Sequence, residues 1–208
     1  ILTRTYENDK YVKFLKQKQI PFVAVGKIPD DDVVQVDHDN VGACRELVTV
    51  LFAKGIQNIA YLGSDMDQMV NRCRYQGYEE AYRKGKRKLN PDLVYTDLSS
   101  KAMVEKAVEE LKKSGVECIL CQDDYICDEV VRKLARMGVR IPDQMKVASC
   151  HYSRILENYP ITVTSLKFNI TELGRRSCQV LLDVIHGKTV PDKTLLDYEI
   201  ILKESTKG

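Results

Sequence analysis

Two adjacent carboxylates, Asp123 and Asp124, follow an apolar run with the character of a β-strand. A carboxylate pair at a strand end is an arrangement that a metal site or a general acid–base pair can use. Asp128 and Glu129 come next, but they fall at least one turn into the following helix, away from the strand end. One alternative reading of the sequence is therefore a small α/β enzyme that uses Asp123 and Asp124.

The motifs of several large enzyme classes are absent from the sequence. There is no G-x-x-x-x-G-K-[ST] phosphate loop and no G-x-G-x-x-G after a strand. There is also no G-x-S-x-G nucleophile elbow and no H-E-x-x-H metal helix. We therefore expect a protein that is not an enzyme and that needs no cofactor.

The seven cysteines are odd in number and irregular in spacing, which is typical of free thiols in a reducing compartment. Cys118 and Cys121 have the spacing of a zinc or redox pair, but they belong to a predicted strand, Val116–Cys121. Side chains alternate along a strand, so residues three apart point to opposite faces. We expect this pair to pack in the core and to bind no metal.

A cluster of five cations, from Arg83 to Lys88, could contact nucleic acid or could simply solvate the end of a helix. The cluster is short and contains no aromatic residue, and cations favour the negative end of a helix dipole. We therefore predict a solvated helix end, and we expect that residues 1–208 alone do not bind operator DNA specifically.

The composition is that of a globular protein, with 208 residues, 44% hydrophobic, 30% charged and a net charge of +2. No apolar run is long enough to span a bilayer, and the N-terminal residues do not have the pattern of a signal peptide. We expect a cytoplasmic protein with no membrane partner. Ile1–Thr3 has the character of a strand end, so we also expect upstream residues to be missing.

Strand-like runs alternate with helical patterns along the chain, which predicts βαβ units, a mostly parallel sheet and the α/β class. In such sheets, ligands bind beyond the carboxyl ends of the strands, here after Gly63, Thr96, Cys121 and Ser149. The predicted helices are Asp9–Gln19, Val41–Lys54, Val70–Lys84, Lys101–Ser114, Tyr125–Met137 and Ile170–His186. The predicted strands are Pro21–Gly26, Val33–Asp37, Asn58–Gly63, Leu93–Thr96, Val116–Cys121, Met145–Ser149, Val163–Leu166 and Asp197–Lys203.

Several motifs, in order along almost the whole chain, resemble those of the lactose-repressor (LacI/GalR) family of bacterial transcription regulators. The most specific stretch runs from Gly138 to Val147 and is similar to the family's G-x-x-[IV]-P-x-D-[IL]-x-V. The others are Ile20–Val25, Val36-Asp37 with Gly42, Lys54-Gly55, Arg74-x-x-Gly77-Tyr78, Thr164-Ser165, Glu172-Leu173-Gly174 and the closing Lys203-Glu204-Ser205-Thr206.

This resemblance implies a two-lobed fold like that of type I periplasmic binding proteins, hinged around an effector and with the first lobe incomplete. Residues 1–32 and 167–192 would form the first lobe, and residues 33–166 and 193–208 the second. A helix-turn-helix head before Ile1 would contact operator DNA, and the intact protein would be a homodimer. A sugar-binding transport protein of the periplasmic type shares the fold and stays an alternative. The lack of an export signal and the seven cysteines argue against it.

The resemblance also implies a set of effector-binding residues. Arg74, Asp123 and His151 match the family's three main polar positions, and further contacts are expected from Gln68, Leu98 and Tyr6.

The chain departs from the family pattern at the pocket, where Ser149-Cys150-His151-Tyr152 replaces G-[FY]-D-[DN]. It also has Ile56 where the family often has histidine and Gln144 where it often has aspartate. His151 in place of a carboxylate, together with Arg74, makes the predicted pocket less negative and favours a phosphorylated or acidic ligand. An unperturbed imidazole gains its charge near pH ~6.5, so we expect the affinity to fall from pH about 5.5 to about 8.

Overall fold

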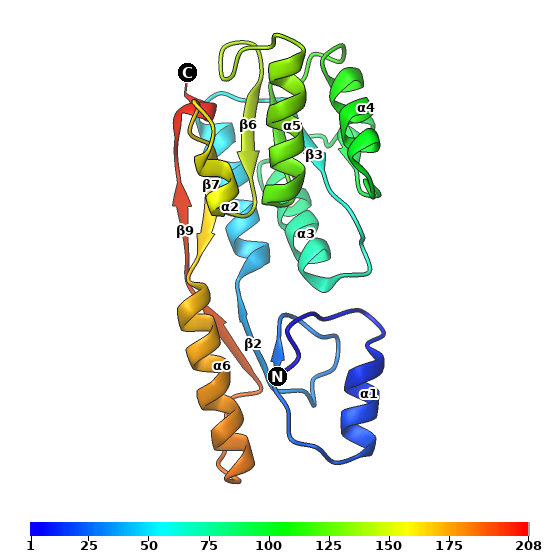
Figure 1. Cartoon of the computed structure of the whole chain (residues 1–208), viewed down its shortest axis with the longest axis vertical. Helices are drawn as coiled ribbons and strands as arrows, with labels where there is room; N and C mark the ends of the chain where they lie inside the picture. Colours follow the sequence, from blue (N-terminus) through cyan, green and yellow to red (C-terminus); the bar gives the residue numbers. More distant parts are fainter. Residues whose placement is uncertain (208) are drawn as a thin grey trace.

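The computed structural model describes residues 1–207 as an elongated molecule with a larger and a smaller sheet (Figure 1). The helices are α1 (Lys10–Gln17), α2 (Asn40–Ala53), α3 (Met69–Lys84), α4 (Lys101–Leu111), α5 (Asp124–Arg136) and α6 (Ile170–Ile185). The strands are β1 (Ala24–Val25), β2 (Gln35–His38), β3 (Ile59–Leu62), β4 (Val94–Tyr95), β5 (Cys118–Cys121), β6 (Lys146–Ser149), β7 (Thr164–Phe168), β8 (Lys193–Leu196) and β9 (Tyr198–Ile201).

All six predicted helices and all eight predicted strands are confirmed, with shifts at their ends. Strand β8 was missed because only Asp197 separates it from β9, and the exposed and half-buried residues of β8 carry little hydrophobic signal. Three short 3₁₀ turns complete the chain at Pro91–Leu93, Arg154–Glu157 and Glu204–Thr206.

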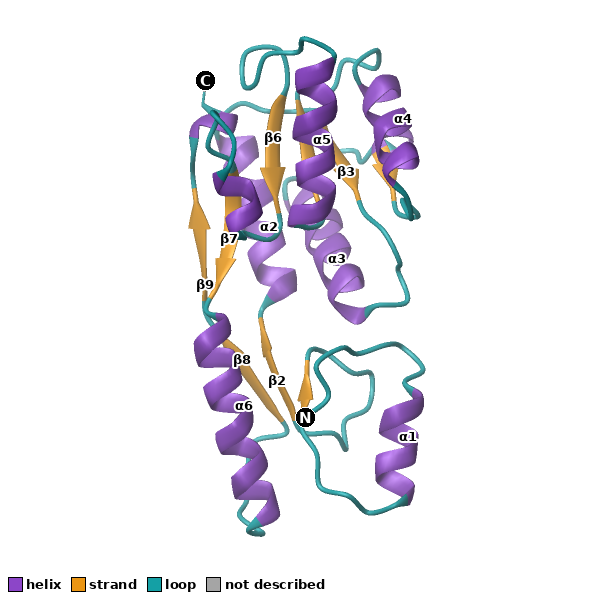
Figure 2. Ribbon diagram, viewed as in Figure 1, coloured by secondary structure: helices purple, strands orange, loops and turns teal. Residues whose placement is uncertain are grey.

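The larger sheet has the strand order β4-β3-β5-β6-β7-β9, and every pair is parallel except β7 with β9. Strand residues alternate between its two faces. Ala60 and Leu62 pack with α4 and α5, whereas Ile59 and Tyr61 pack with α2 and α3. The sheet is therefore covered by helices on both faces, as Figure 2 shows, and this accounts for the apolar character of its central strands.

The smaller sheet has the order β1-β2-β8 and is parallel throughout. Val180 of α6 packs with Val23 and Val36 against one side of it, and Val12 of α1 packs with Ala24 in a separate cluster. The N-terminus lies with this sheet and the C-terminus at the far end of the larger one (Figure 1).

The chain passes between the two sheets after His38, after Phe168 and after Leu196. These crossings lie a few residues later than the lobe boundaries expected at 32/33, 166/167 and 192/193. The difference arises because β2 and β8 pair with each other along their whole length in the smaller sheet, whereas the sequence division assigned both to the other lobe.

Helices α2 and α3 pack closely at Gly77, which faces α2. A Cβ atom at Gly77 would lie 2.4 Å from the main-chain oxygen of Val41 and 2.8 Å from Cβ of Cys44. Only glycine permits this approach. The Arg74-x-x-Gly77-Tyr78 motif therefore has a packing role at Gly77, one turn after Arg74.

The closing Lys203–Thr206 motif ties the end of the chain to the larger sheet. Ser205 Oγ donates to the main-chain oxygen of Val147 at 2.6 Å and accepts from the N–H of Thr164 at 2.9 Å. The hydroxyl groups of Thr164 and Thr206 lie 2.7 Å apart. The motif thus satisfies buried polar groups of β6 and β7, which would be costly to leave unpaired.

The seven cysteines are free thiols in the described chain. Cys118 and Cys121 are buried on opposite faces of the larger sheet, as the strand periodicity predicted. The basic residues at the end of α3 are mostly exposed, and the Arg87 guanidinium lies over the Phe52 ring at 4.3 Å. Within residues 1–207, no helix combines the length and the apolar character that crossing a bilayer requires.

Candidate functional site

A cavity of about 230 Å³ lies where the two sheets meet, and both parts of the molecule line it. It is smaller than the roughly 300–1,000 Å³ of typical ligand sites, so its present shape suits a small ligand. The ends of β1, β2 and β7, the starts of α2, α3 and α6, and the N-terminal segment contribute to its wall.

Arg74 brings a buried positive charge to this cavity from the second turn of α3, where its side chain is only 8% exposed. Its Nη1 donates to the main-chain oxygen of Gln122 at 3.0 Å, whereas its Nε has no hydrogen-bond partner. A guanidinium stays charged in proteins, and an unpaired buried donor is costly. Arg74 therefore retains an unused capacity to bind an acceptor.

Two imidazoles line the same cavity, with one aromatic ring close to both. His38 ends β2, His151 follows β6, and Phe168 ends β7. The Phe168 ring centroid lies 4.9 Å from that of His38 and 6.2 Å from that of His151, with the second pair stacked. His38 Nε2 and His151 Nδ1 are buried and lack hydrogen-bond partners among the described residues. These nitrogens, like Arg74 Nε, are available to a polar ligand.

The environment of the imidazoles corrects the expected pH dependence. Burial lowers the pKa of His151, and the positive charge of Arg74 lowers it further, against the weaker influence of Asp124 and Asp123. Burial also lowers the pKa of His38. The prediction of a charge on His151 near pH ~6.5 used the value of an unperturbed imidazole, and that value does not apply here. Both imidazoles of this cavity are therefore harder to protonate than an unperturbed histidine.

Asp37 is the carboxylate in the wall of this cavity. Its Oδ1 accepts from the N–H of His38 at 2.8 Å and from Nδ2 of Asn40 at 3.2 Å. Burial raises its pKa to about 6, although those hydrogen bonds and the charges of Arg74 and Lys193 act in the opposite direction. Asp37 is mainly ionised at neutral pH and can accept hydrogen bonds from hydroxyl groups.

The structure brings three of the six predicted site residues together, namely Gln68, Arg74 and His151. Asp123 and Leu98 lie instead in a second pocket of about 310 Å³ beside α4 and α5. The Asp123 carboxylate caps α5 by accepting from the N–H of Ile126 at 2.9 Å. Asp123 lies at the end of β5, as expected from the sequence, but its Oδ1 accepts the hydrogen bond that caps α5.

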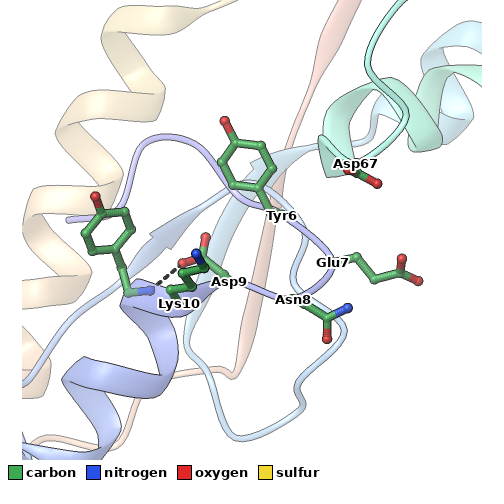
Figure 3. A pocket seen from close by; sticks show the side chains of 7 residues that line it. Tyr6, Glu7, Asn8, Asp9, Lys10 and Asp67 are labelled. Carbon is green, nitrogen blue, oxygen red and sulfur yellow. Dashed lines mark hydrogen bonds between the residues drawn. The ribbon is translucent and has the colours of Figure 1, made fainter. Parts of the chain in front are cut away.

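Tyr6 lines a third pocket of about 360 Å³, formed by residues 6–11 and Asp67 (Figure 3). Its backbone forms an antiparallel bridge with Gln68. The N–H of Met69 donates to the oxygen of Thr5 at 3.0 Å, so the N-terminal segment is fastened to the start of α3. Tyr6 is thus adjacent to Gln68 along this bridge without lining the cavity that holds Arg74.

The sequence reasoning missed Asp37 and His38 of the smaller sheet, Asn40 at the start of α2, and Phe168 at the end of β7. Sequence analysis predicts ligand-binding loops only after Gly63, Thr96, Cys121 and Ser149, which all belong to the larger sheet. Asp37 belongs to a family motif, which by itself indicates no binding role. The available signal was that a polar run follows the β-rich segment ending at Asp37, as polar residues do at the ligand-facing ends of parallel strands.

The carboxylate pair lacks the geometry of a metal centre. Asp123 caps α5, and Asp124 is buried in the first turn of that helix. Across residues 1–207, no cluster of three or more His, Cys, Asp or Glu side chains is arranged to hold a metal ion. The donors that do converge are those of the cavity between the sheets.

Comparison with known proteins assigns the fold to a family. The sequence profile of the periplasmic binding protein-like domain family matches residues 48–206, and the chain belongs to this family. It is 26% identical to the HTH-type transcriptional regulator CelR of Thermobifida fusca over 99% of this chain and 62% of that protein. It is 27% identical to the HTH-type transcriptional regulator GntR of Escherichia coli K12, over 94% of this chain and 59% of GntR.

Solved structures agree with these sequence matches. The structure of a CelR–cellobiose complex matches with a TM-score of 0.88 and 25% identity, covering 98% of this chain and 64% of that one. A LacI-family regulator from Chloroflexus aggregans matches with a TM-score of 0.89 and 23% identity, covering 98% and 75%, and so supports the fold alone. The predicted resemblance to LacI-family regulators is confirmed, and the chain spans about three-fifths of the curated relatives that it matches.

Proposed function

We propose that this chain is the effector-binding core of a LacI-type transcription regulator. A small polar molecule binds in the cavity between the larger and the smaller sheet, and these two parts act as hinged lobes. Binding shifts the equilibrium between lobe arrangements, which changes operator affinity in the intact protein. Such a regulator works in the cytoplasm.

The observation that carries this proposal is the convergence of unpaired polar atoms in one cavity. Arg74 Nε, His38 Nε2 and His151 Nδ1 are buried, lack partners among the described residues, and belong to residues lining a cavity that both sheets share. Buried polar groups are normally hydrogen-bonded, so three unpaired polar atoms on residues that line one cavity favour the binding of a polar ligand there. A ligand that satisfies all three bridges the two lobes and favours one arrangement of them.

The relatives support a regulator over the two alternatives. The curated proteins that this chain resembles are transcription regulators, which favours a binding protein over an enzyme acting through Asp123 and Asp124. They also favour a regulator over a transport protein of the same fold. In the longer relatives, the part that this chain does not cover is where we propose that operator DNA is contacted.

We also propose that the intact protein is a homodimer, because two-fold-symmetric operators require paired DNA-binding heads. Sedimentation of the intact protein tests this point independently of ligand binding. A dimer is expected, whereas a monomer across the micromolar range would exclude this part of the proposal.

Calorimetry after a thermal-shift screen tests the proposed function. The panel contains neutral sugars (glucose, cellobiose and maltose), sugar phosphates, sugar acids and nucleosides. We expect at least one compound to raise the melting temperature and to bind with a one-to-one stoichiometry. If no member of the panel binds, or if a compound is turned over, the chain is not the proposed sensor.

A further inference from the structure

We propose that the ligand of this cavity is a hydroxylated organic anion, a sugar phosphate or sugar acid, whose charged group lies among Arg74, His38 and His151. This inference rests on the proposed function and specifies its ligand class. Hydroxyl groups of the same ligand face Asp37, and Phe168 supplies the apolar wall between the two imidazoles.

The first argument is the charge of Arg74. Over residues 1–207, no carboxylate lies within ion-pair distance of its guanidinium, and its one hydrogen bond goes to the neutral main chain of Gln122. Asp37 lines the same cavity and its carboxylate interacts with the charge of Arg74, but the two form no direct ion pair. A buried cation without a direct ion-pair partner is unfavourable, and a bound negative charge relieves this cost. A neutral sugar can accept from Nε but adds no negative charge, whereas a phosphate or carboxylate does both.

The second argument is the number of unpaired polar atoms on the residues that line this one cavity. Arg74 Nε is a donor in every state, and each neutral imidazole can present its unpaired nitrogen as a donor or as an acceptor. An anionic group offers two or three oxygens and can engage all three residues. The exposed Arg4 also lines the cavity and adds a second permanent positive charge.

The carboxylates around the cavity define the part of the ligand that lies away from its charged group. Asp37 lines the same cavity, and Asp123 and Asp124 act on His151 from the start of α5. Lys193, on β8, acts on Asp37. A second anionic group near Asp37 would be repelled, whereas hydroxyl groups donate to its carboxylate. The cavity therefore fits a molecule with one charged end and a hydroxylated body.

Binding of such an anion has a consequence that a neutral sugar does not share. A negative charge beside His38 and His151 raises their pKa values from the lowered values of the free protein, and it raises that of Asp37 as well. All three groups then hold protons more strongly in the complex, so the anion binds with proton uptake and its affinity falls as pH rises. Hydroxyl groups donating to Asp37 have the opposite effect on that carboxyl.

The test is isothermal titration of the protein with three matched probes: glucose, glucose 6-phosphate and glucuronate. Each titration is run at pH 6.5 in two buffers of different ionisation heat, which gives the number of protons taken up. We expect at least one of the two anions to bind at least about tenfold more tightly than glucose. Net proton uptake is expected with glucuronate, whose carboxylate is already ionised at pH 6.5, whereas a phosphate monoester titrates near pH ~6 and can contribute protons of its own. The two anions distinguish a phosphate-selective from a carboxylate-selective cavity.

Histidine variants identify which side chains take up protons when the anion binds. His151→Asn and His38→Asn should each reduce the uptake, whereas His186→Asn, an exposed histidine at the end of α6, should leave it unchanged. Because His38 is buried, the proton uptake of the unmodified protein remains the deciding measurement if His38→Asn does not fold.

The possible failures can be told apart. If glucose binds as tightly as both anions, or if glucuronate binds without proton uptake, this inference is overturned while the sensor function stands. If neither anion binds but a neutral sugar of the wider panel does, the same conclusion follows. If nothing binds, both proposals fail.

Discussion

Arg74 Nη1 donates a 3.0 Å hydrogen bond to the main-chain oxygen of Gln122, and this bond joins α3 to the carboxyl end of β5. The bond fixes the guanidinium at the edge of the larger sheet, with Nε left unpaired. Gln122 is fully buried, so the position of its carbonyl is set by the core. Arg74 is thus held by the fold at one end and unsatisfied at the other, which is the arrangement of a ligand-binding side chain.

Replacing this side chain by a neutral one should therefore weaken ligand binding. In Arg74→Gln, we expect the affinity for the ligand found by screening to fall at least about tenfold, or roughly 1.4 kcal/mol, because a charge-assisted hydrogen bond is lost. Arg83→Gln, at an exposed position near the end of the same helix, is the matched control and should bind normally. Equal affinities of Arg74→Gln and the control, measured by calorimetry, would exclude Arg74 from the site.

His151→Asp restores a carboxylate where the family commonly has one. We expect this variant to bind glucose 6-phosphate at least about tenfold more weakly, about 1.4 kcal/mol, because a negative charge faces the anion and a donor is lost. For a neutral sugar, the change should be smaller or of opposite sign. Unchanged affinity for the anionic probe would remove His151 from the site.

The fold could be predicted from the sequence to a large extent because helix and strand periods are strong signals in this chain. Helix α5, for example, begins at the cap Asp123 and has an apolar face that packs on the sheet. The exception, β8, has a burial pattern that alternates between exposed and half-buried residues, so its strand character depends on pairing with β2.

The candidate site could be predicted only in part, because a cavity joins residues from distant segments. Arg74 and His151 follow from motifs of the larger sheet. His38 and Phe168 lie in strands of different sheets, and the 4.9 Å distance between their ring centroids depends on how these sheets are placed relative to each other. From the sequence alone, Asp123 could be either a helix cap or a ligand-binding residue, because both kinds of carboxylate occur at the end of a strand. The structure shows that it caps α5.

The Lys203–Thr206 motif should stabilise the fold through hydrogen bonds that are remote from the cavity. Ser205→Ala removes a buried hydroxyl that donates to Val147 and accepts from Thr164, and it leaves the buried N–H of Thr164 unpaired. We expect the free energy of unfolding in urea to fall by about 2–3 kcal/mol. Ser114→Ala, which removes an exposed hydroxyl bonded to Leu111, should change it by less than about 0.5 kcal/mol. Similar small values for both would contradict the assigned role.

Because burial raises the pKa of Asp37, we expect the stability difference between Asp37→Asn and the unmodified protein to depend on pH. Its pKa rises from 3.8 in the unfolded chain to about 6 in the fold, so the folded state holds the proton more strongly. The resulting stabilisation is complete below pH 3.8 and is lost as pH rises through 6. Asp37→Asn keeps a neutral side chain throughout, so without ligand it should gain up to about 3 kcal/mol relative to the unmodified protein between pH 4 and 8.

Urea unfolding of both proteins at several pH values measures this difference. Asp31→Asn removes a carboxylate from an exposed position nearby and should show no comparable gain. A stability difference for Asp37→Asn that stays constant from pH 4 to 8 would mean that the carboxyl of Asp37 is not buried as described.

The central claim is that the ligand binds in the cavity between the two sheets, and the three histidines of the chain test it most directly. His38 and His151 line that cavity, whereas His186 is exposed at the far end of α6. Nuclear magnetic resonance can follow the ring signals of all three during titration with the tightest ligand of the panel. We predict that the signals of His38 and His151 shift with the same saturation curve, while that of His186 stays in place. Saturable binding that leaves His38 and His151 unmoved would place the ligand elsewhere and contradict the account.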